Sequence, residues 1–124
     1  MNAAFTEREL DLMNVLWDRG SATVAEMLGL LDDDSAYTTV STLLRILVDK
    51  GYVEARPEGR AHRYHPLVER SEAGTSALRR LTDRIFNGSP EATLTHLVSD
   101  TELSEEQLRR VKELLEERLG ATDS

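Results

Sequence analysis

The chain has 124 residues, of which 40% are hydrophobic, 31% are charged and none is cysteine. This length allows one domain or two small ones to fold without cross-links, and the lack of cysteine excludes disulfides, thiolate metal sites and a cysteine nucleophile. The net charge of -8 argues against a nucleic-acid partner unless basic residues gather on one surface. No apolar run approaches the ~18 residues of a membrane helix, so we expect a cytoplasmic protein without membrane insertion.

The first two predicted helices each begin with a capping box, in which a hydroxyl and a carboxylate three residues later exchange hydrogen bonds with the backbone. Thr6 and Glu9 begin a helix over residues 6–19, and Thr23 and Glu26 begin a shorter second helix. Large apolar residues recur at helical spacing in both, and we expect them to pack in the core. These residues are Leu10, Met13, Trp17, Val24, Met27, Leu28 and Leu31.

A third helix is predicted over residues 36–50, with Ser35 as its N-cap and Gly51 as its left-handed stop. The acidic turn at residues 32–34 lies near the positive end of its dipole. One face is apolar and contains Val40, Leu43, Leu44 and Leu47. The other face is polar and contains Thr38, Ser41, Thr42 and Arg45. Small hydroxyls allow a helix to approach a DNA duplex closely, and arginine can reach guanine or phosphate; a simply solvated face is the alternative.

Residues 52–66 predict a two-stranded hairpin, because alternating residues flank the turn-forming sequence Pro57-Glu58-Gly59. His62 and His65 are three residues apart, so on a strand they point to opposite faces and cannot chelate one metal ion together. Residues 35–66 are net positive although the whole chain is acidic. The basic residues there are Arg45, Lys50, Arg56, Arg60 and Arg63, against the acidic residues Asp49, Glu54 and Glu58.

The rest of the chain predicts three more helices. The first of them ends at Asn87-Gly88. The second begins with Ser89 as its N-cap and Pro90 as its first residue. The last begins at Ser104, and we expect it to end before Gly120. The apolar stripes of the last two helices need a partner, and a second copy of the chain is the simplest one. We therefore expect a homodimer formed by Leu94, Leu97, Val98, Leu108, Val111, Leu115 and Leu119.

Three helices followed by a hairpin is the order of a winged helix-turn-helix, whose third helix enters the major groove of DNA. We predict a mainly α fold with a small β-hairpin wing, a DNA-binding domain over residues 1–68 and a helical dimerisation domain over residues 69–124. The sequence has no Gly-rich phosphate loop, G-x-S-x-G or H-E-x-x-H motif, so we expect no enzyme and no cofactor. A winged-helix adaptor that binds protein in place of DNA is the alternative function.

Several stretches resemble the BlaI/MecI group of penicillinase-type repressors: LDLMNVLW, YTTVSTLLRILVDKGYV, GRAHRYHP, FNGS and LSEEQLRRVKELLEE. The resemblance implies a homodimeric repressor of operator DNA with an N-terminal winged helix and a C-terminal dimerisation arm. The resemblance implies that Thr38, Thr39, Ser41, Thr42 and Arg45 lie in the recognition helix and that Arg60 lies in the wing. Because residues 35–66 are net positive, we also expect Lys50, Arg56 and Arg63 to contact DNA. Many relatives have an arginine where this chain has Ile46, so this chain lacks either one contact to the DNA backbone or an ion pair that anchors the helix.

The resemblance also implies how the repressor leaves DNA. The best-known relatives are inactivated by cleavage of the C-terminal arm between an asparagine and a phenylalanine, after a membrane metalloprotease senses a β-lactam. The corresponding positions here are His96 and Leu97, counted back from Leu103-Ser104. We expect loss of dimerisation to release a pseudo-palindromic operator. A sensor metalloprotease encoded nearby is then a candidate partner, and an unidentified ligand or signal is the alternative.

Overall fold

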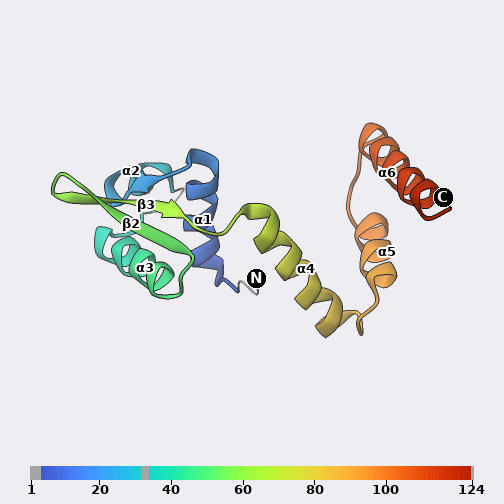
Figure 1. Cartoon of the computed structure of the whole chain (residues 1–124), viewed down its shortest axis with the longest axis horizontal. Helices are drawn as coiled ribbons and strands as arrows, with labels where there is room; N and C mark the ends of the chain where they lie inside the picture. The colour runs from blue at the N-terminus through green and yellow to red at the C-terminus, as the bar shows by residue number, and fades with distance from the viewer. Residues whose placement is uncertain (1–3, 32–33, 124) are drawn as a thin grey trace. The chain divides into compact units, whose positions relative to one another are not determined.

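The computed structural model describes residues 4–31 and 34–123, so Asp32 and Asp33 of the predicted acidic turn lie outside the described residues. It divides into two compact units, Met1–Arg80 and Leu81–Ser124. As predicted, the fold is mainly α with a small antiparallel sheet (Figure 1). Among residues 4–31 and 34–123, no helix is both long enough and apolar enough to cross a bilayer. The elements in chain order are α1 (Glu7–Arg19), β1 (Ala22–Thr23), α2 (Val24–Leu30), α3 (Tyr37–Asp49), β2 (Val53–Glu58), β3 (Ala61–Pro66), α4 (Arg70–Ile85), α5 (Pro90–Asp100) and α6 (Glu105–Asp123).

The first unit encloses one apolar core between α1, α2, α3 and the sheet. Both predicted capping boxes are confirmed, at Thr6 with Glu9 and at Thr23 with Glu26. The core consists of Leu12, Met13, Leu16, Ala22, Val24, Met27, Val40, Leu44, Leu47, Val53 and Val68.

The buried face of α1 differs from the predicted stripe. Leu10, which the sequence predicts in the core, is 37% exposed. The buried residues of this face are Leu12, Met13 and Leu16. Trp17 lies at the edge of the core, where its indole Nε1 donates a 2.8 Å hydrogen bond to the Val68 carbonyl. An amphipathic indole suits such an edge because its N–H needs a partner once it is removed from water.

The N-terminus of α3 also differs from the prediction. Ala36 is the N-cap, and no side chain caps the helix. The hydroxyl of Ser35 instead accepts a hydrogen bond from the guanidinium of Arg8 in α1. At the other end, Gly51 follows the helix with φ +84°, a conformation that glycine adopts without steric cost.

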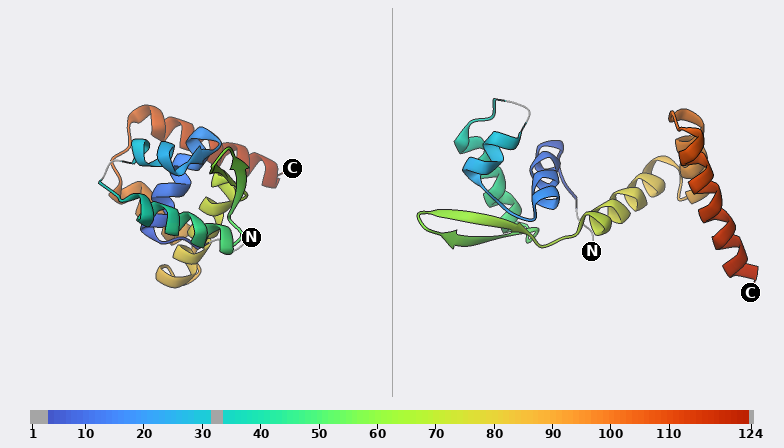
Figure 2. Two further views of the ribbon diagram at one scale, coloured as in Figure 1. Left: turned by 90° about the vertical axis from the view of Figure 1, so that its left-hand side faces the viewer. Right: turned by 90° about the horizontal axis from the view of Figure 1, so that it is seen from above.

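The sheet has three strands in the order β1-β3-β2, one more than the predicted hairpin. The unpredicted strand β1 pairs with β3 through Ala22↔Tyr64 and Thr23↔Arg63. Strands β2 and β3 form the hairpin and extend beyond the helices as a wing (Figure 2). Its turn is Gly59-Arg60, with Gly59 at φ +62°. The turn therefore lies further along the chain than predicted, and Pro57 belongs to edge strand β2, where a missing N–H is tolerated.

The second unit contains the end of α4 together with α5 and α6. Ser89 accepts a 3.0 Å hydrogen bond from the backbone of Ala92 and caps α5, with Pro90 at its start. Ser104 and Gln107 form the third capping box. Helix α6 continues through Gly120, contrary to the prediction, because a single glycine weakens a helix by only ~1 kcal/mol. None of residues 81–122 is buried.

Candidate nucleic-acid interface

Helix α3 presents two chemically distinct faces, as the sequence predicts. Val40, Leu44 and Leu47 are completely buried, and Leu43 packs against the core. The polar face is open to solvent, with Thr38, Thr39, Thr42 and Arg45 exposed and Ser41 half-buried. Arg45 forms no ion pair or hydrogen bond with any residue that the structure describes. This face therefore combines four small hydroxyls with one uncompensated guanidinium.

The wing carries two exposed arginines in different electrostatic environments. Arg60 lies in the turn, and within residues 4–31 and 34–123 it has no hydrogen-bond or ion-pair partner. Arg56 lies on β2, 3.0 Å from a carboxylate oxygen of Glu54. This hydrogen bond lowers the pKa of Glu54. Because both side chains of the pair are exposed, the pair is weak enough for a phosphate to compete for the guanidinium.

Arg63 lies on β3 and binds two carboxylates. Its Nε and Nη2 donate to the two oxygens of Glu58, each at 2.9 Å. Its Nη1 and Nη2 donate to the two oxygens of Glu26, at 3.0 and 2.9 Å. These bonds lower the pKa values of both carboxyls and raise that of the guanidinium. Arg63 is therefore part of a hydrogen-bonded cluster, in contrast to Arg60.

Lys50 is also paired with a carboxylate. Its Nζ lies 2.8 Å from one oxygen of Glu9 and 3.2 Å from the other, and the Glu9 side chain is only 2% exposed. Burial raises the pKa of Glu9, but hydrogen bonds from Lys50 and from the Thr6 backbone outweigh it, so the pKa lies below its ordinary value of 4.5. The pair ties the C-terminus of α3 to the N-terminus of α1.

The sequence predicts Glu9 and Glu26 as capping residues, and Glu58 as a turn residue and a negative charge. Capping was correct, but each carboxylate also binds a cation from another element. The hairpin register could have revealed one pair, because Glu58 is opposite Ala61 and is therefore a diagonal neighbour of Arg63. The partners of Glu9 and Glu26 are 41 and 37 residues away, and no local pattern indicates them.

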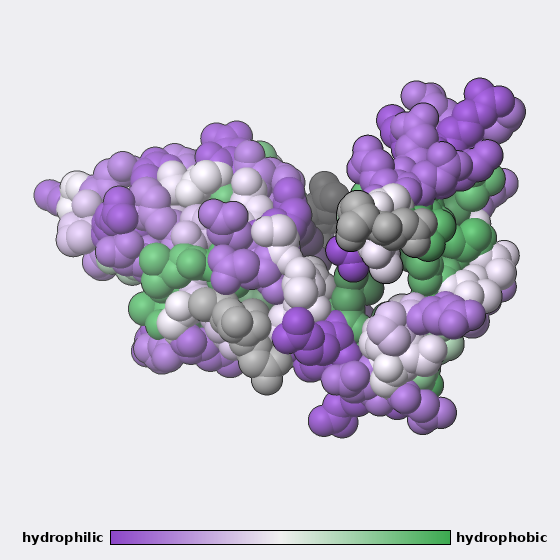
Figure 3. All heavy atoms as spheres, turned by 45° about the vertical axis from the view of Figure 1, so that its right-hand side comes forward, coloured by the Kyte–Doolittle hydropathy of each residue, from purple (hydrophilic) through white to green (hydrophobic). Residues whose placement is uncertain are grey.

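The predicted dimerisation residues lie on α5 and α6. Most of them are exposed, from 40% for Val98 to 64% for Leu119, and Val111 is half-buried. On the face drawn in Figure 3, hydrophobic side chains lie at the surface of the C-terminal helices. The exposed large apolar residues of the second unit are Leu81, Ile85, Leu94, Leu97, Val98, Leu108, Leu114, Leu115 and Leu119.

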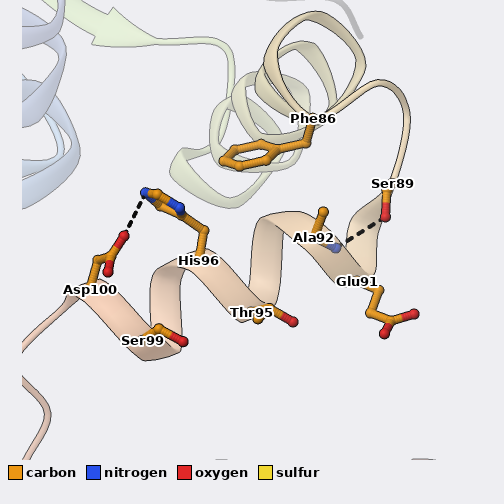
Figure 4. A pocket seen from close by; sticks show the side chains of 8 residues that line it. All are labelled: Phe86, Ser89, Glu91, Ala92, Thr95, His96, Ser99 and Asp100. Atoms are coloured by element: carbon orange, nitrogen blue, oxygen red, sulfur yellow. Dashed lines mark hydrogen bonds and ion pairs between the residues drawn. The ribbon is translucent and has the colours of Figure 1, made fainter.

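The candidate cleavage pair, His96 and Leu97, lies within α5 and not in a loop. Figure 4 shows His96 beside a surface pocket, with its Nε2 2.9 Å from a carboxylate oxygen of Asp100. Its ring centroid lies 5.5 Å from that of Phe86. In the described part of the chain, no three His, Asp or Glu side chains form a group that could hold a metal ion.

Comparison with known proteins identifies the family. Residues 5–117 match the profile of the penicillinase repressors. The chain is 38% identical over 116 residues to the transcriptional regulator BlaI of Mycobacterium tuberculosis, covering 87% of this chain and 82% of that protein. It is 26% identical over 114 residues to the penicillinase repressor of Bacillus licheniformis, with 90% and 89% covered. The solution structure of the DNA binding domain of the repressor BlaI has a TM-score of 0.52 at 27% identity, covering 58% of this chain and 90% of that one. The chain therefore belongs to the BlaI/MecI family of penicillinase repressors, with a winged-helix N-terminal unit.

Proposed function

We propose that this protein is a sequence-specific DNA-binding transcriptional repressor that acts as a homodimer on a pseudo-palindromic operator. The observation that carries the proposal is the polar face of α3, where Arg45 has no partner among the described residues while the opposite face is fixed in the core. A rigid helix with small hydroxyls can enter the major groove closely. Arg45 then reads a guanine edge or binds a phosphate.

The proposed contacts differ in role. Thr38, Thr39, Ser41 and Thr42 line the approach of α3 to the groove, and Arg60 and Arg56 bind the phosphate backbone beside it. Lys50 and Arg63 contribute less to this binding, because carboxylates already compensate their charges. The negative charge of the rest of the chain weakens non-specific binding to DNA. Residues 1–68 act as the DNA-binding domain and residues 69–124 as the dimerisation domain.

The homodimer is supported by the second unit, in which none of residues 81–122 is buried and the large apolar side chains of α5 and α6 are mostly exposed. Helices with such faces need a partner to remain folded in water. A symmetric dimer presents two copies of α3, and this symmetry accounts for a pseudo-palindromic operator.

Release from DNA follows from loss of this dimer. Cleavage between His96 and Leu97 separates most of α5 from α6 and removes the apolar stripe of α6 from the arm. Because the bond lies inside a helix, a metalloprotease reaches it only when α5 opens locally. Operator affinity then falls through lost avidity, with α3 unchanged.

Titration of a labelled duplex at several salt concentrations tests DNA binding. The duplex is drawn from genomic fragments that co-purify with the protein, and a scrambled duplex is the control. We expect the logarithm of affinity to fall steeply with the logarithm of salt concentration, and the genomic fragment to bind more tightly than the scrambled one. Failure to bind either duplex at low salt would favour the protein-binding adaptor, for which the net charge of -8 is suitable.

A further inference from the structure

Arg63 has an unusual hydrogen-bond environment for an arginine of a DNA-binding wing. Besides the four bonds to Glu58 and Glu26, its Nη1 donates to the Ser21 hydroxyl at 3.3 Å. A guanidinium has five N–H donors, and the five bonds at Arg63 involve Nε once, Nη1 twice and Nη2 twice. Every donor is therefore in use.

The local charge also disfavours a phosphate at this site. One guanidinium lies between two carboxylates, so Arg63, Glu26 and Glu58 together are net negative, and Arg19 is a further cation whose charge helps to lower the pKa of Glu26. The side chain of Arg63 is only 25% exposed. A phosphate would have to displace a bidentate carboxylate pair, which is among the stronger hydrogen-bonded arrangements in proteins, and would then approach the carboxylate it had displaced.

The cluster connects three parts of the first unit. Arg63 belongs to β3, the central strand of the sheet, and is opposite Thr23 of β1 and Arg56 of β2. Glu26 lies in the first turn of α2. Glu58 is the last residue of β2, immediately before the turn that contains Arg60. The guanidinium therefore links helix α2 to the end of strand β2, where the wing turn begins.

We propose that Arg63 is a positioning residue, which fixes the wing tip through Glu26 and Glu58 so that Arg60 meets the DNA backbone. This inference rests on the proposed DNA binding. The wing is a two-stranded extension whose tip lies beyond the core, and such ribbons bend and twist readily. Anchoring Glu58 to α2 restricts the direction in which the following turn points.

A double-mutant cycle tests the proposal, with the variants Arg60→Ala, Arg63→Gln and their combination titrated with operator duplex over a salt series. We expect Arg63→Gln to weaken binding about tenfold in the parent, the equivalent of one lost charged hydrogen bond, and to lower the salt slope by about 0.9. When Arg60 is already alanine, Arg63→Gln should change neither the affinity nor the salt slope further. A direct phosphate contact by Arg63 would instead add a second loss, and a general loss of stability would weaken binding without changing the slope.

Glu26→Gln provides a second variant that keeps the fold, because glutamine also serves in a capping box. It removes the ion pair with Arg63 and one negative charge near DNA. Simple electrostatics predicts tighter binding, whereas positioning predicts weaker binding that disappears in the Arg60→Ala background. Additive losses in either cycle, or unchanged affinity in Arg63→Gln, overturn the inference while leaving the proposed function intact. A parent protein that binds no duplex overturns both.

Discussion

The two units of this chain differ in how far their apolar side chains are buried. In the first unit, helices and strands enclose a core whose largest side chains are fully buried. In the second unit no residue from 81 to 122 is buried, although its helices also carry large apolar side chains at helical spacing. An apolar stripe at helical spacing therefore predicts that other apolar side chains will pack against that face of the helix. It does not predict that those side chains belong to the same chain. A segment of this size is also too small to form a stable core alone.

The largest effect should come from breaking the apolar stripe of the second unit. Replacing Val111 and Leu115 together by aspartate places charges where the proposed dimer requires desolvated surface. We expect monomers at micromolar concentration in sedimentation, and an operator affinity lower by ~10² to 10⁴ because two half-sites are no longer engaged together.

The matched control for this variant is Lys112→Asp, which introduces the same acidic side chain at a position whose present side chain is 77% exposed. It should remain dimeric and bind operator nearly as the parent does. A dimeric double-aspartate variant, or a monomeric parent, contradicts the assignment of the interface.

Sequence predicted much of the fold and the surface of α3, because each depends on short-range patterns. Capping boxes, the apolar stripe at Val40 and Leu44, and the hairpin all depend on residues close in the chain. The sequence did not predict strand β1, since two residues are too few for any periodicity to appear. Nor could it predict that Glu26 binds Arg63 or that Glu9 binds Lys50, because these two carboxylates come from helices distant in sequence. A count of basic residues therefore overestimated how many cations are uncompensated.

The second largest effect should come from the polar face of α3. Arg45→Ala should cost about 1 to 3 kcal/mol on operator DNA if the guanidinium binds a base edge, and it should leave the dimer intact. Arg45→Lys separates two mechanisms, because lysine keeps the charge but loses the bidentate geometry. Titration with operator and scrambled duplexes is the measurement. Equal losses on both duplexes would assign Arg45 to phosphate, and no loss on either would exclude it from the interface.

A third comparison concerns ion pairs in the two units. Glu9→Gln keeps the capping box but removes the pair with Lys50, and it should lower the free energy of unfolding at pH 7 by about 1 to 2 kcal/mol. Because the pKa of Glu9 is lowered in the folded protein, its stabilising contribution is complete above its ordinary value of 4.5. The contribution is lost as the pH falls through the lowered folded value. The difference between parent and variant should therefore narrow below about pH 4.5.

Urea unfolding at pH 7 and at acidic pH measures this difference. Glu105→Gln is the control in the second unit, since Glu105 and its partner Arg109 are 80% and 73% exposed. Such a pair contributes at most ~0.5 kcal/mol. If both variants lose the same stability, the pair of the buried Glu9 with Lys50 has no special role in holding α3 against α1.

The smallest effect concerns Ile46, which is 39% exposed beside Arg45. A large apolar side chain at this position contributes little to the core and offers no donor to DNA. Ile46→Arg should add one phosphate contact, so the salt slope should steepen by about 0.9 and the affinity should rise on operator and scrambled duplexes alike. Ile46→Gln is the control, because it removes the apolar group without adding charge. A change confined to the operator duplex would show that position 46 meets a base edge, and an unchanged slope would place it outside the interface. Either result would reveal how far along α3 the DNA backbone extends.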